Sequence, residues 1–140
     1  MFDGRCLCGQ VQYEIDGEIG PIDFCHCSYC RRASGSAFAS NATILSASFK
    51  LRSGADVLKE FESTPGKFRS FCSSCGSPIY ARLAAVPEFL RIRVGTLSSD
   101  PGSRPCGHFD VESKAPWFTI TDDLPQFDEQ GRPAAPPSVG

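Results

Sequence analysis

Seven of the eight cysteines in this 140-residue chain fall into three tight groups. The groups read CLCG from residue 6, CHCSYC from residue 25 and CSSCG from residue 72. Tetrahedral zinc needs thiolates about 3.5–4 Å apart around Zn–S bonds of about 2.3 Å, and a CxC or CxxC turn supplies two of them from one short piece of backbone. Disulfides are the alternative, but a loop as short as CxC is strained and closes little chain entropy. The spacing therefore favours zinc sites.

The first and last groups together provide four thiols. They are Cys6, Cys8, Cys72 and Cys75, and a glycine follows the second cysteine of each pair. A residue without a Cβ lets the chain turn tightly there and aim backbone N–H groups at the sulfurs. Four ligands complete a structural site, which would join the N-terminal segment to the middle of the chain.

The central group offers only Cys25, Cys27 and Cys30. A zinc ion with three protein ligands keeps one position for water or substrate, as expected of a reactive site. We therefore expect these three cysteines to form the catalytic centre. The alternative is a second closed site, whose fourth ligand would be one of three residues: His26, Cys106 or His108.

Two residues near these groups are not expected to be ligands. His26 lies between two presumed ligands, and in an extended segment its side chain would point away from their shared metal. It would then support the site as a hydrogen-bond donor or proton acceptor, or simply pack as an imidazole. Cys106 stands alone in a stretch rich in Pro and Gly, where an inert thiol is the simpler interpretation.

Bulk composition restricts the class of protein. A length of 140 residues corresponds to one domain, and 41% hydrophobic with 21% charged residues is typical of a folded globular chain. The formal net charge of −2 and the scattered basic residues argue against nucleic acid as a partner. The sequence shows no secretory signal and no apolar stretch long enough for a membrane span, so we expect no membrane association and a cytoplasmic location.

Alternating apolar residues predict a mainly β, single-domain fold. One short helix is allowed at Ser28–Ser34, ended by Gly35, and the eleven phenylalanines are expected to supply much of the core. The domain is expected to span residues 1–127, with a Pro-rich tail over 128–140. The expected strands are Val11–Ile15, Ala37–Leu45, Phe49–Arg52, Val57–Phe61, Phe68–Phe71, Ile79–Leu83 and Phe89–Val94.

The motifs and their order carry a resemblance to a known family. GxCxCG, CHCxxCRRASG, CxxCG and SKAPWFTITDDLPQF follow one another from Gly4 to about Phe127. This pattern resembles the glutathione-dependent formaldehyde-activating family, which also includes centromere-protein-V-like members. The resemblance implies a β-tent fold, in which antiparallel strands are stabilised by zinc.

The resemblance also implies a partition of the cysteines and a reaction. Cys6, Cys8, Cys72 and Cys75 match the family's structural zinc ligands, and Cys25, Cys27 and Cys30 match those of the catalytic zinc, giving two zinc ions per chain. The implied activity is that of a carbon–sulfur lyase, in which glutathione as co-substrate condenses with formaldehyde to S-hydroxymethylglutathione. A non-catalytic glutathione or thiol binder, or a zinc-stabilised interaction module, is the alternative.

Several residues outside the cysteine groups invite a role near the substrate. Asp110 stands where a more apolar strand leading into SKAPW is expected. Trp117 would either wall the ligand pocket or close the core. For the others an ordinary role is the simpler interpretation: surface charge for Arg31, Arg32 and Lys114, which could otherwise hold glutathione carboxylates, and turn formation for Asp122 and Asp123.

Overall fold

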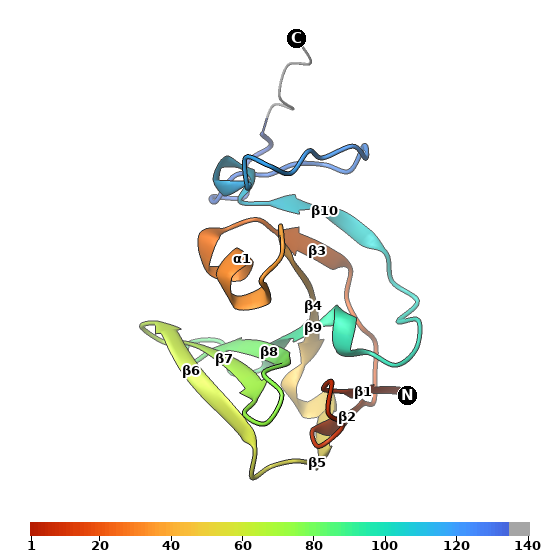
Figure 1. The fold of residues 1–140 in the computed structure, drawn as a ribbon. Helices are drawn as coiled ribbons and strands as arrows, with labels where there is room; N and C mark the ends of the chain where they lie inside the picture. The colour runs from red at the N-terminus through yellow and green to blue at the C-terminus, as the bar shows by residue number, and fades with distance from the viewer. Residues whose placement is uncertain (135–140) are drawn as a thin grey trace.

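In the computed structural model, which describes residues 1–134, the chain forms ten strands and one α-helix (Figure 1). The helix, α1, spans Ser28–Ser34 and ends at Gly35 in the left-handed conformation, as predicted. The strands are β1 (Phe2–Arg5), β2 (Gln12–Ile15), β3 (Ile22–Cys25), β4 (Ala39–Leu45), β5 (Phe49–Ser53), β6 (Leu58–Thr64), β7 (Lys67–Cys72), β8 (Pro78–Leu83), β9 (Phe89–Arg93) and β10 (Pro105–Phe109).

The strands form two sheets. The smaller has the order β1-β2-β5, and the larger has the order β10-β3-β4-β9-β8-β7-β6. Figure 1 shows β3 and β10 in its upper half and β6, β7 and β8 in its lower half, with α1 beside β3. The sequence therefore predicted the mainly β class and the single domain correctly.

One strand pair departs from a purely antiparallel arrangement. All the other ladders are antiparallel, but β10 runs parallel to β3 at the edge of the larger sheet. A parallel neighbour requires a long connection from one strand to the next, and here the chain passes through six intervening strands before β10 pairs with β3. This late pairing brings Phe109 opposite Cys25, beside the central cysteine group.

The sequence predicted seven strands, two from alternation and five as short β-like runs, and each of them is present with ends shifted by a few residues. The three that it missed are β1, β3 and β10. The first two are only four residues long, and β10, with the sequence PCGHF, contains both residues that usually argue against a strand. Edge position explains the proline, because β10 lies at the end of the sheet order.

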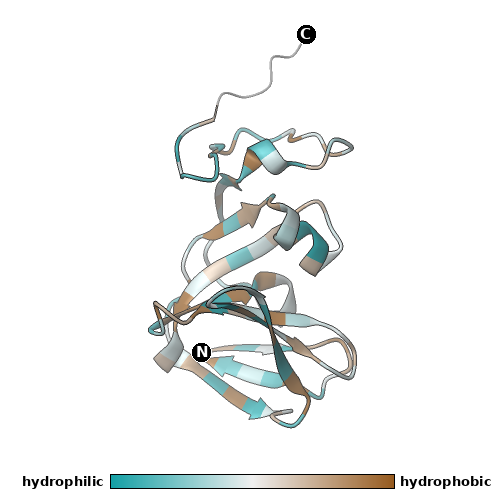
Figure 2. Cartoon of the chain, turned by 90° about the vertical axis from the view of Figure 1, so that its left-hand side faces the viewer, coloured by the Kyte–Doolittle hydropathy of each residue, from teal (hydrophilic) through white to brown (hydrophobic). Residues whose placement is uncertain are grey.

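The core lies between the smaller sheet and part of the larger one. Its completely buried members include Val11, Ile15, Ile79 and Ile92. Figure 2 shows apolar and polar residues alternating along strands in the lower half of the molecule, as a sheet with one buried face requires. The expectation that phenylalanines fill this core was wrong, since none of the eleven is fully buried. Branched aliphatic side chains and the ring of Tyr13 fill the core, and Phe2, Phe24 and Phe49 pack against it as partly buried rings.

The segment after β10 is ordered against the larger sheet. His108 exchanges backbone hydrogen bonds with Pro125 and Phe127, and residues 128–134 turn back so that Ala134 N–H donates to the Gln126 carbonyl. The predicted tail thus begins with a short docked turn, and its remainder, residues 135–140, lies outside the described part of the chain. No helix among residues 1–134 combines the length and apolar character that crossing a membrane requires.

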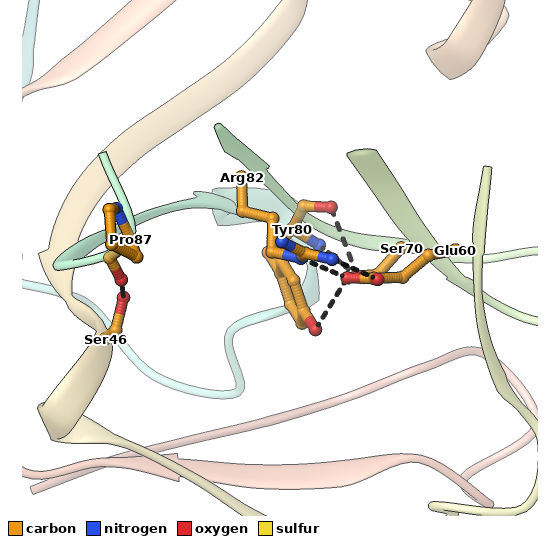
Figure 3. Close-up of polar contacts among 6 residues, drawn as sticks. All are labelled: Ser46, Glu60, Ser70, Tyr80, Arg82 and Pro87. Atoms are coloured by element: carbon orange, nitrogen blue, oxygen red, sulfur yellow. Dashed lines mark hydrogen bonds and ion pairs between the residues drawn. The ribbon is translucent and has the colours of Figure 1, made fainter. Parts of the chain in front are cut away.

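Side-chain contacts connect the edge strand β6 to the neighbouring strands of the larger sheet (Figure 3). Arg82 forms a two-pronged ion pair with Glu60, with N–O distances of 2.7 and 2.8 Å, and the Tyr80 hydroxyl donates to the same carboxylate. Ser70 accepts from the Tyr80 backbone N–H. On the other side of the view, the Ser46 hydroxyl donates to the Pro87 carbonyl. The contacts of Glu60, Ser70, Tyr80 and Arg82 link the strands β6, β7 and β8 to one another.

Candidate metal centres

The first and last cysteine groups meet in one cluster. The sulfurs of Cys6, Cys8, Cys72 and Cys75 all lie within 4.8 Å of one another. The Sγ–Sγ distance is 3.6 Å from Cys6 to Cys8 and 3.8 Å from Cys8 to Cys72. Two thiolates on one tetrahedral zinc ion, each at about 2.3 Å from the metal, are about 3.8 Å apart. The cluster therefore has the donor set and the dimensions of a four-thiolate metal site.

Two similar turns shape this cluster. Gly9 and Gly76, which follow the second cysteine of each pair, have φ values of 82° and 81°. Their N–H groups donate to the carbonyl oxygens of Cys6 and Cys72, and so close the turns. The N–H donors to sulfur come from later residues, among them Val11, whose N–H lies 3.3 Å from Cys6 Sγ. The glycines permit the turn and do not themselves contact the sulfurs.

Neighbouring groups shift the pKa values of these thiols in opposite directions. A hydrogen bond from the Ser77 side chain is the main cause that lowers the pKa of Cys75 to about 5. Cys8 accepts from the Gln10 backbone, but burial and the neighbouring thiols prevail and raise its pKa to about 11. Closely packed thiols cannot all ionise without a cation between them, which is the condition that a metal ion relieves.

The central group forms a second cluster. Cys25 ends β3, Cys27 is the N-cap of α1 and Cys30 lies in its first turns, and the three sulfurs lie within 4.8 Å of one another. The Cys30 backbone N–H donates to Cys27 Sγ at 3.3 Å. Among residues 1–134, no further Cys, His, Asp or Glu meets the same mutual distance limit in this cluster. Three thiols could hold a metal ion and leave one position to another group.

A buried cation balances the charge of the second cluster. Arg69 on β7 is buried, and its Nη1 atom lies 3.8 Å from Cys30 Sγ. Hydrogen bonds from Cys25 and Cys27, together with this guanidinium, hold the pKa of Cys30 well below its ordinary value. The same thiol contacts and burial raise the pKa of Cys25. Three thiolates and one Zn²⁺ would carry a net charge of −1, which Arg69 is placed to offset.

A cavity of about 340 Å³ opens beside this cluster. Cys25 and Cys30 belong to its wall, and three basic residues, Lys67, Arg91 and Arg93, also line it. The volume is at the lower end of the range for small-molecule sites. A cavity that combines cysteine sulfur with several cations can accept a small anionic ligand that carries a thiol.

The three basic side chains of the cavity wall differ in whether they already have a polar partner. Arg91 pairs with Asp23 at 2.5 Å, and buried Arg93 donates to the Asn41 side-chain oxygen. Lys67 takes part in no ion pair among residues 1–134. The Lys67 ammonium is therefore the cation on this wall that an incoming carboxylate would not have to share.

Asp110 contacts the second cluster directly. Its Oδ2 atom lies 3.2 Å from Cys25 Sγ, and the residue belongs to the cavity wall. The backbone at Asp110 is left-handed, with φ 57° and ψ 41°. The sequence marked this residue only as a departure from the expected apolar strand, because its proximity to Cys25 depends on the parallel pairing of β10 with β3.

His26 lies apart from the second cluster's sulfurs and is completely buried. Its Nε2 atom is 2.7 Å from His108 Nδ1, and His108 Nε2 is 3.0 Å from a carboxylate oxygen of Asp122. Phe38 and Phe118 pack around the His26 ring. Burial lowers the pKa of His26 to about 4, so its imidazole is neutral near pH 7. This position agrees with the prediction that His26 is not a ligand, and it shows the ring packed in the interior.

Asp122 combines two roles. Its carboxylate accepts from the Leu124 backbone N–H, which is the turn function expected from the sequence. The same carboxylate accepts from His108, a contact that the sequence did not indicate because the two residues are 14 positions apart on different segments. Asp123, its neighbour, is exposed.

Trp117 and the three basic residues considered for substrate contact do not line this cavity. Trp117 is 70% exposed, so it neither walls this cavity nor closes the core, and Phe118 packs inward instead. Trp117 follows Pro116, which fixes the local chain direction, and precedes the inward-packed Phe118. Arg31, Arg32 and Lys114 are absent from the cavity wall. The basic residues that line it come from β7 and β9, where strand alternation alone does not tell which face carries a cavity.

Comparison with known proteins identifies the family. A family model described as glutathione-dependent formaldehyde-activating enzyme matches residues 1–113. The chain belongs to this family. The matched region of the glutathione-dependent formaldehyde-activating family contains all eight cysteines of the chain and therefore both clusters. No curated protein matches this sequence.

A solved structure resembles this family member. The crystal structure of a Rhodobacter sphaeroides protein, a structural genomics target, superimposes with a TM-score of 0.60 and 26% sequence identity. The alignment covers 74% of this chain and 97% of that one. The sequence motifs therefore identified the family correctly, and the fold is shared with a protein of known structure.

Proposed function

We propose that this chain is a zinc-dependent enzyme that makes and breaks a carbon–sulfur bond, converting glutathione and formaldehyde into S-hydroxymethylglutathione. The observation that carries the proposal is the convergence of Cys25, Cys27 and Cys30 at the wall of a cavity that also carries cations. Membership of the formaldehyde-activating family supports a glutathione-related role. A reducing compartment such as the cytoplasm suits this role, because it keeps the thiols free.

The two clusters would divide the work. Cys6, Cys8, Cys72 and Cys75 would hold a structural zinc ion, since four thiols at tetrahedral spacing leave no position for substrate. The central three cysteines would hold the second ion. When bound there, zinc supplies a Lewis acid that lowers the pKa of a thiol ligand and so favours the nucleophilic thiolate at neutral pH.

The chain's own residues would bind and orient the substrate. Glutathione carries two carboxylates, and Lys67 is the uncommitted cation on the cavity wall. Arg69, behind Cys30, compensates thiolate charge, so it supports the cluster rather than the substrate. An ammonium that fixes a carboxylate at a distance from the reacting sulfur restricts the orientation of the thiol and favours its approach to the aldehyde carbon.

The reaction itself provides the test. Two-dimensional exchange NMR on glutathione and formaldehyde should show faster exchange in the presence of zinc-loaded protein than without it. Cys30→Ser should abolish this acceleration, and Cys106→Ser, which changes an exposed thiol outside both clusters, should retain it. Lys67→Met should weaken the apparent affinity for glutathione and leave that for 2-mercaptoethanol unchanged. Glutathione binding without any acceleration of exchange would contradict the enzyme and leave a non-catalytic thiol binder.

A further inference from the structure

Asp110 has the least usual backbone conformation in the described part of the chain. It is the one non-glycine residue among residues 1–134 with a positive φ. Asp and Asn adopt this region more readily than other side chains, but it remains uncommon. Strain of this kind persists where the surrounding structure fixes the residue, and it gathers at ligand-binding and active sites.

The sheet fixes Asp110 relative to the second cluster. Phe109 is paired with Cys25 in the parallel ladder, and the His26 backbone N–H donates to the Phe109 carbonyl at 2.9 Å. The chain leaves β10 directly after this bond, and the left-handed turn at Asp110 follows. The contact between Asp110 and Cys25 therefore rests on backbone pairing as well as on the side chain.

The contact needs a cation once Cys25 is a metal ligand. A thiolate and a carboxylate with 3.2 Å between sulfur and oxygen repel each other strongly in a partly buried site. Two ligands of the same tetrahedral zinc ion, with Zn–S of about 2.3 Å and Zn–O of about 2.0 Å, are about 3.5 Å apart. The separation of Asp110 Oδ2 and Cys25 Sγ is close to that value.

The other candidates for a fourth ligand are placed elsewhere. His26 and His108 are paired with each other, and Cys106 is exposed and does not line the cavity beside the three cysteines. Asp110 belongs to the cavity wall together with Cys25 and Cys30, and its carboxylate contacts Cys25. It does not lie within 4.8 Å of all three sulfurs, so ligation requires the carboxylate to move toward the centre of the cluster.

We propose that Asp110 is the fourth protein ligand of the metal held by Cys25, Cys27 and Cys30, and that an external thiol competes with its carboxylate for that position. The first half depends only on the metal site, and the second half rests on the proposed function. The resting centre then has three sulfur ligands and one oxygen ligand, and a thiol gains the position only by exceeding the affinity of Asp110.

Cobalt substitution of the full-length protein tests the proposal. Co²⁺ reports its ligand set in the visible absorption spectrum, and the four-cysteine site contributes equally to all variants. Asp110→Asn keeps the size of the side chain and tolerates the left-handed backbone, while Asp110→Gly removes the side chain and all backbone strain. Asp23→Asn is the matched control, because Asp23 is a second carboxylate on the same cavity wall that pairs with Arg91.

Both Asp110 variants should shift the ligand-field bands, and Asp23→Asn should not. Chelator competition should show a metal affinity at the second site at least about tenfold lower in the Asp110 variants, and titration with glutathione should show tighter binding to any metal that remains. Identical spectra in wild type and both Asp110 variants would overturn the ligand assignment, whether or not glutathione binds. If the spectra shift but no variant binds glutathione, Asp110 is a ligand and the proposed function fails instead.

Discussion

The imidazole rings of His26 and His108 share a hydrogen bond of 2.7 Å between Nε2 of the first and Nδ1 of the second, although the residues are 82 positions apart. The contact with Asp122 gives the direction of this bond when the His108 ring is neutral. The Asp122 carboxylate accepts from His108 Nε2, so in the neutral ring Nδ1 is the acceptor and His26 Nε2 donates to it. The other nitrogen of His26 then carries no proton, which agrees with its lack of a hydrogen-bond partner in the described structure.

Asp122 should therefore stabilise the fold through His108. Asp122→Ala leaves the His108 N–H buried without its acceptor, so the free energy of unfolding should fall by about 1–3 kcal/mol. Asp123→Ala, at the exposed neighbouring position, should change it by less than about 0.5 kcal/mol. Urea denaturation of the zinc-loaded proteins measures both. Equal losses in the two variants would mean that the contact with His108 contributes nothing.

The hydrogen-bonded series of His26, His108 and Asp122 was only partly predictable from the sequence. Strand alternation predicted that the side chain of the histidine between Cys25 and Cys27 points away from their shared metal, and His26 indeed lies outside the sulfur cluster. Its hydrogen-bond partner, His108, could not be predicted, because the bond depends on the parallel pairing of β10. This strand contains Pro105 and Gly107, two residue types that are unusual within strands. The same missing strand hid the approach of Asp110 to Cys25. Local patterns predicted the cysteine groups, and non-local pairing decided what surrounds them.

The ion pair of Glu60 with Arg82 should make stability depend on pH. The hydrogen bond from Arg82 is the main cause that holds the pKa of Glu60 below its usual value in the fold. A lowered folded pKa means that the contribution is present above the unfolded pKa of about 4.3 and is lost as the pH falls through the folded value. Glu60→Gln should cost about 0.5–1 kcal/mol at pH 7. The difference from wild type should vanish in strong acid, and a difference that grows there would contradict the assignment.

The two cysteine clusters should differ in their effect on stability. Cys72 is completely buried and belongs to the cluster that joins β7 to the N-terminal segment. Cys72→Ser should therefore lower the free energy of unfolding by several kcal/mol, and Cys27→Ser by clearly less. Cys106→Ser is the control for thiol removal as such, and it should stay within about 0.5 kcal/mol of wild type. Similar large losses at residues 72 and 27 would indicate that both sites are structural.

Arg69 should matter for metal retention at the second cluster. Its guanidinium helps to lower the pKa of Cys30, after the hydrogen bonds from Cys25 and Cys27. Arg69→Gln should weaken zinc affinity at this cluster by about tenfold, as loss of a group that supports a ligand usually does. Arg82→Gln removes an arginine from the adjacent strand that pairs with Glu60 instead (Figure 3). Competition with a coloured chelator should show normal zinc retention for that control.

The spacing of the central cysteines predicted the cluster but not the cavity beside it. Three thiols at CxCxxC spacing were sufficient to predict their convergence, because strand end, N-cap and first helical turn are adjacent in any such fold. The cavity could not be predicted in the same way. Its cations come from β7 and β9, which become neighbours of Cys30 only when the larger sheet is assembled.

The most direct test of the account is calorimetric titration of the zinc-loaded protein with glutathione in buffers of different ionisation heat. If the thiol binds through sulfur at the three-cysteine centre, binding should release about one proton at pH 7, since a free thiol has a pKa of about 8.5 and a metal-bound one is ionised. S-methylglutathione has no ionisable thiol and should bind much more weakly, without proton release. Equal binding of the two ligands, with the same heat in every buffer, would contradict the account.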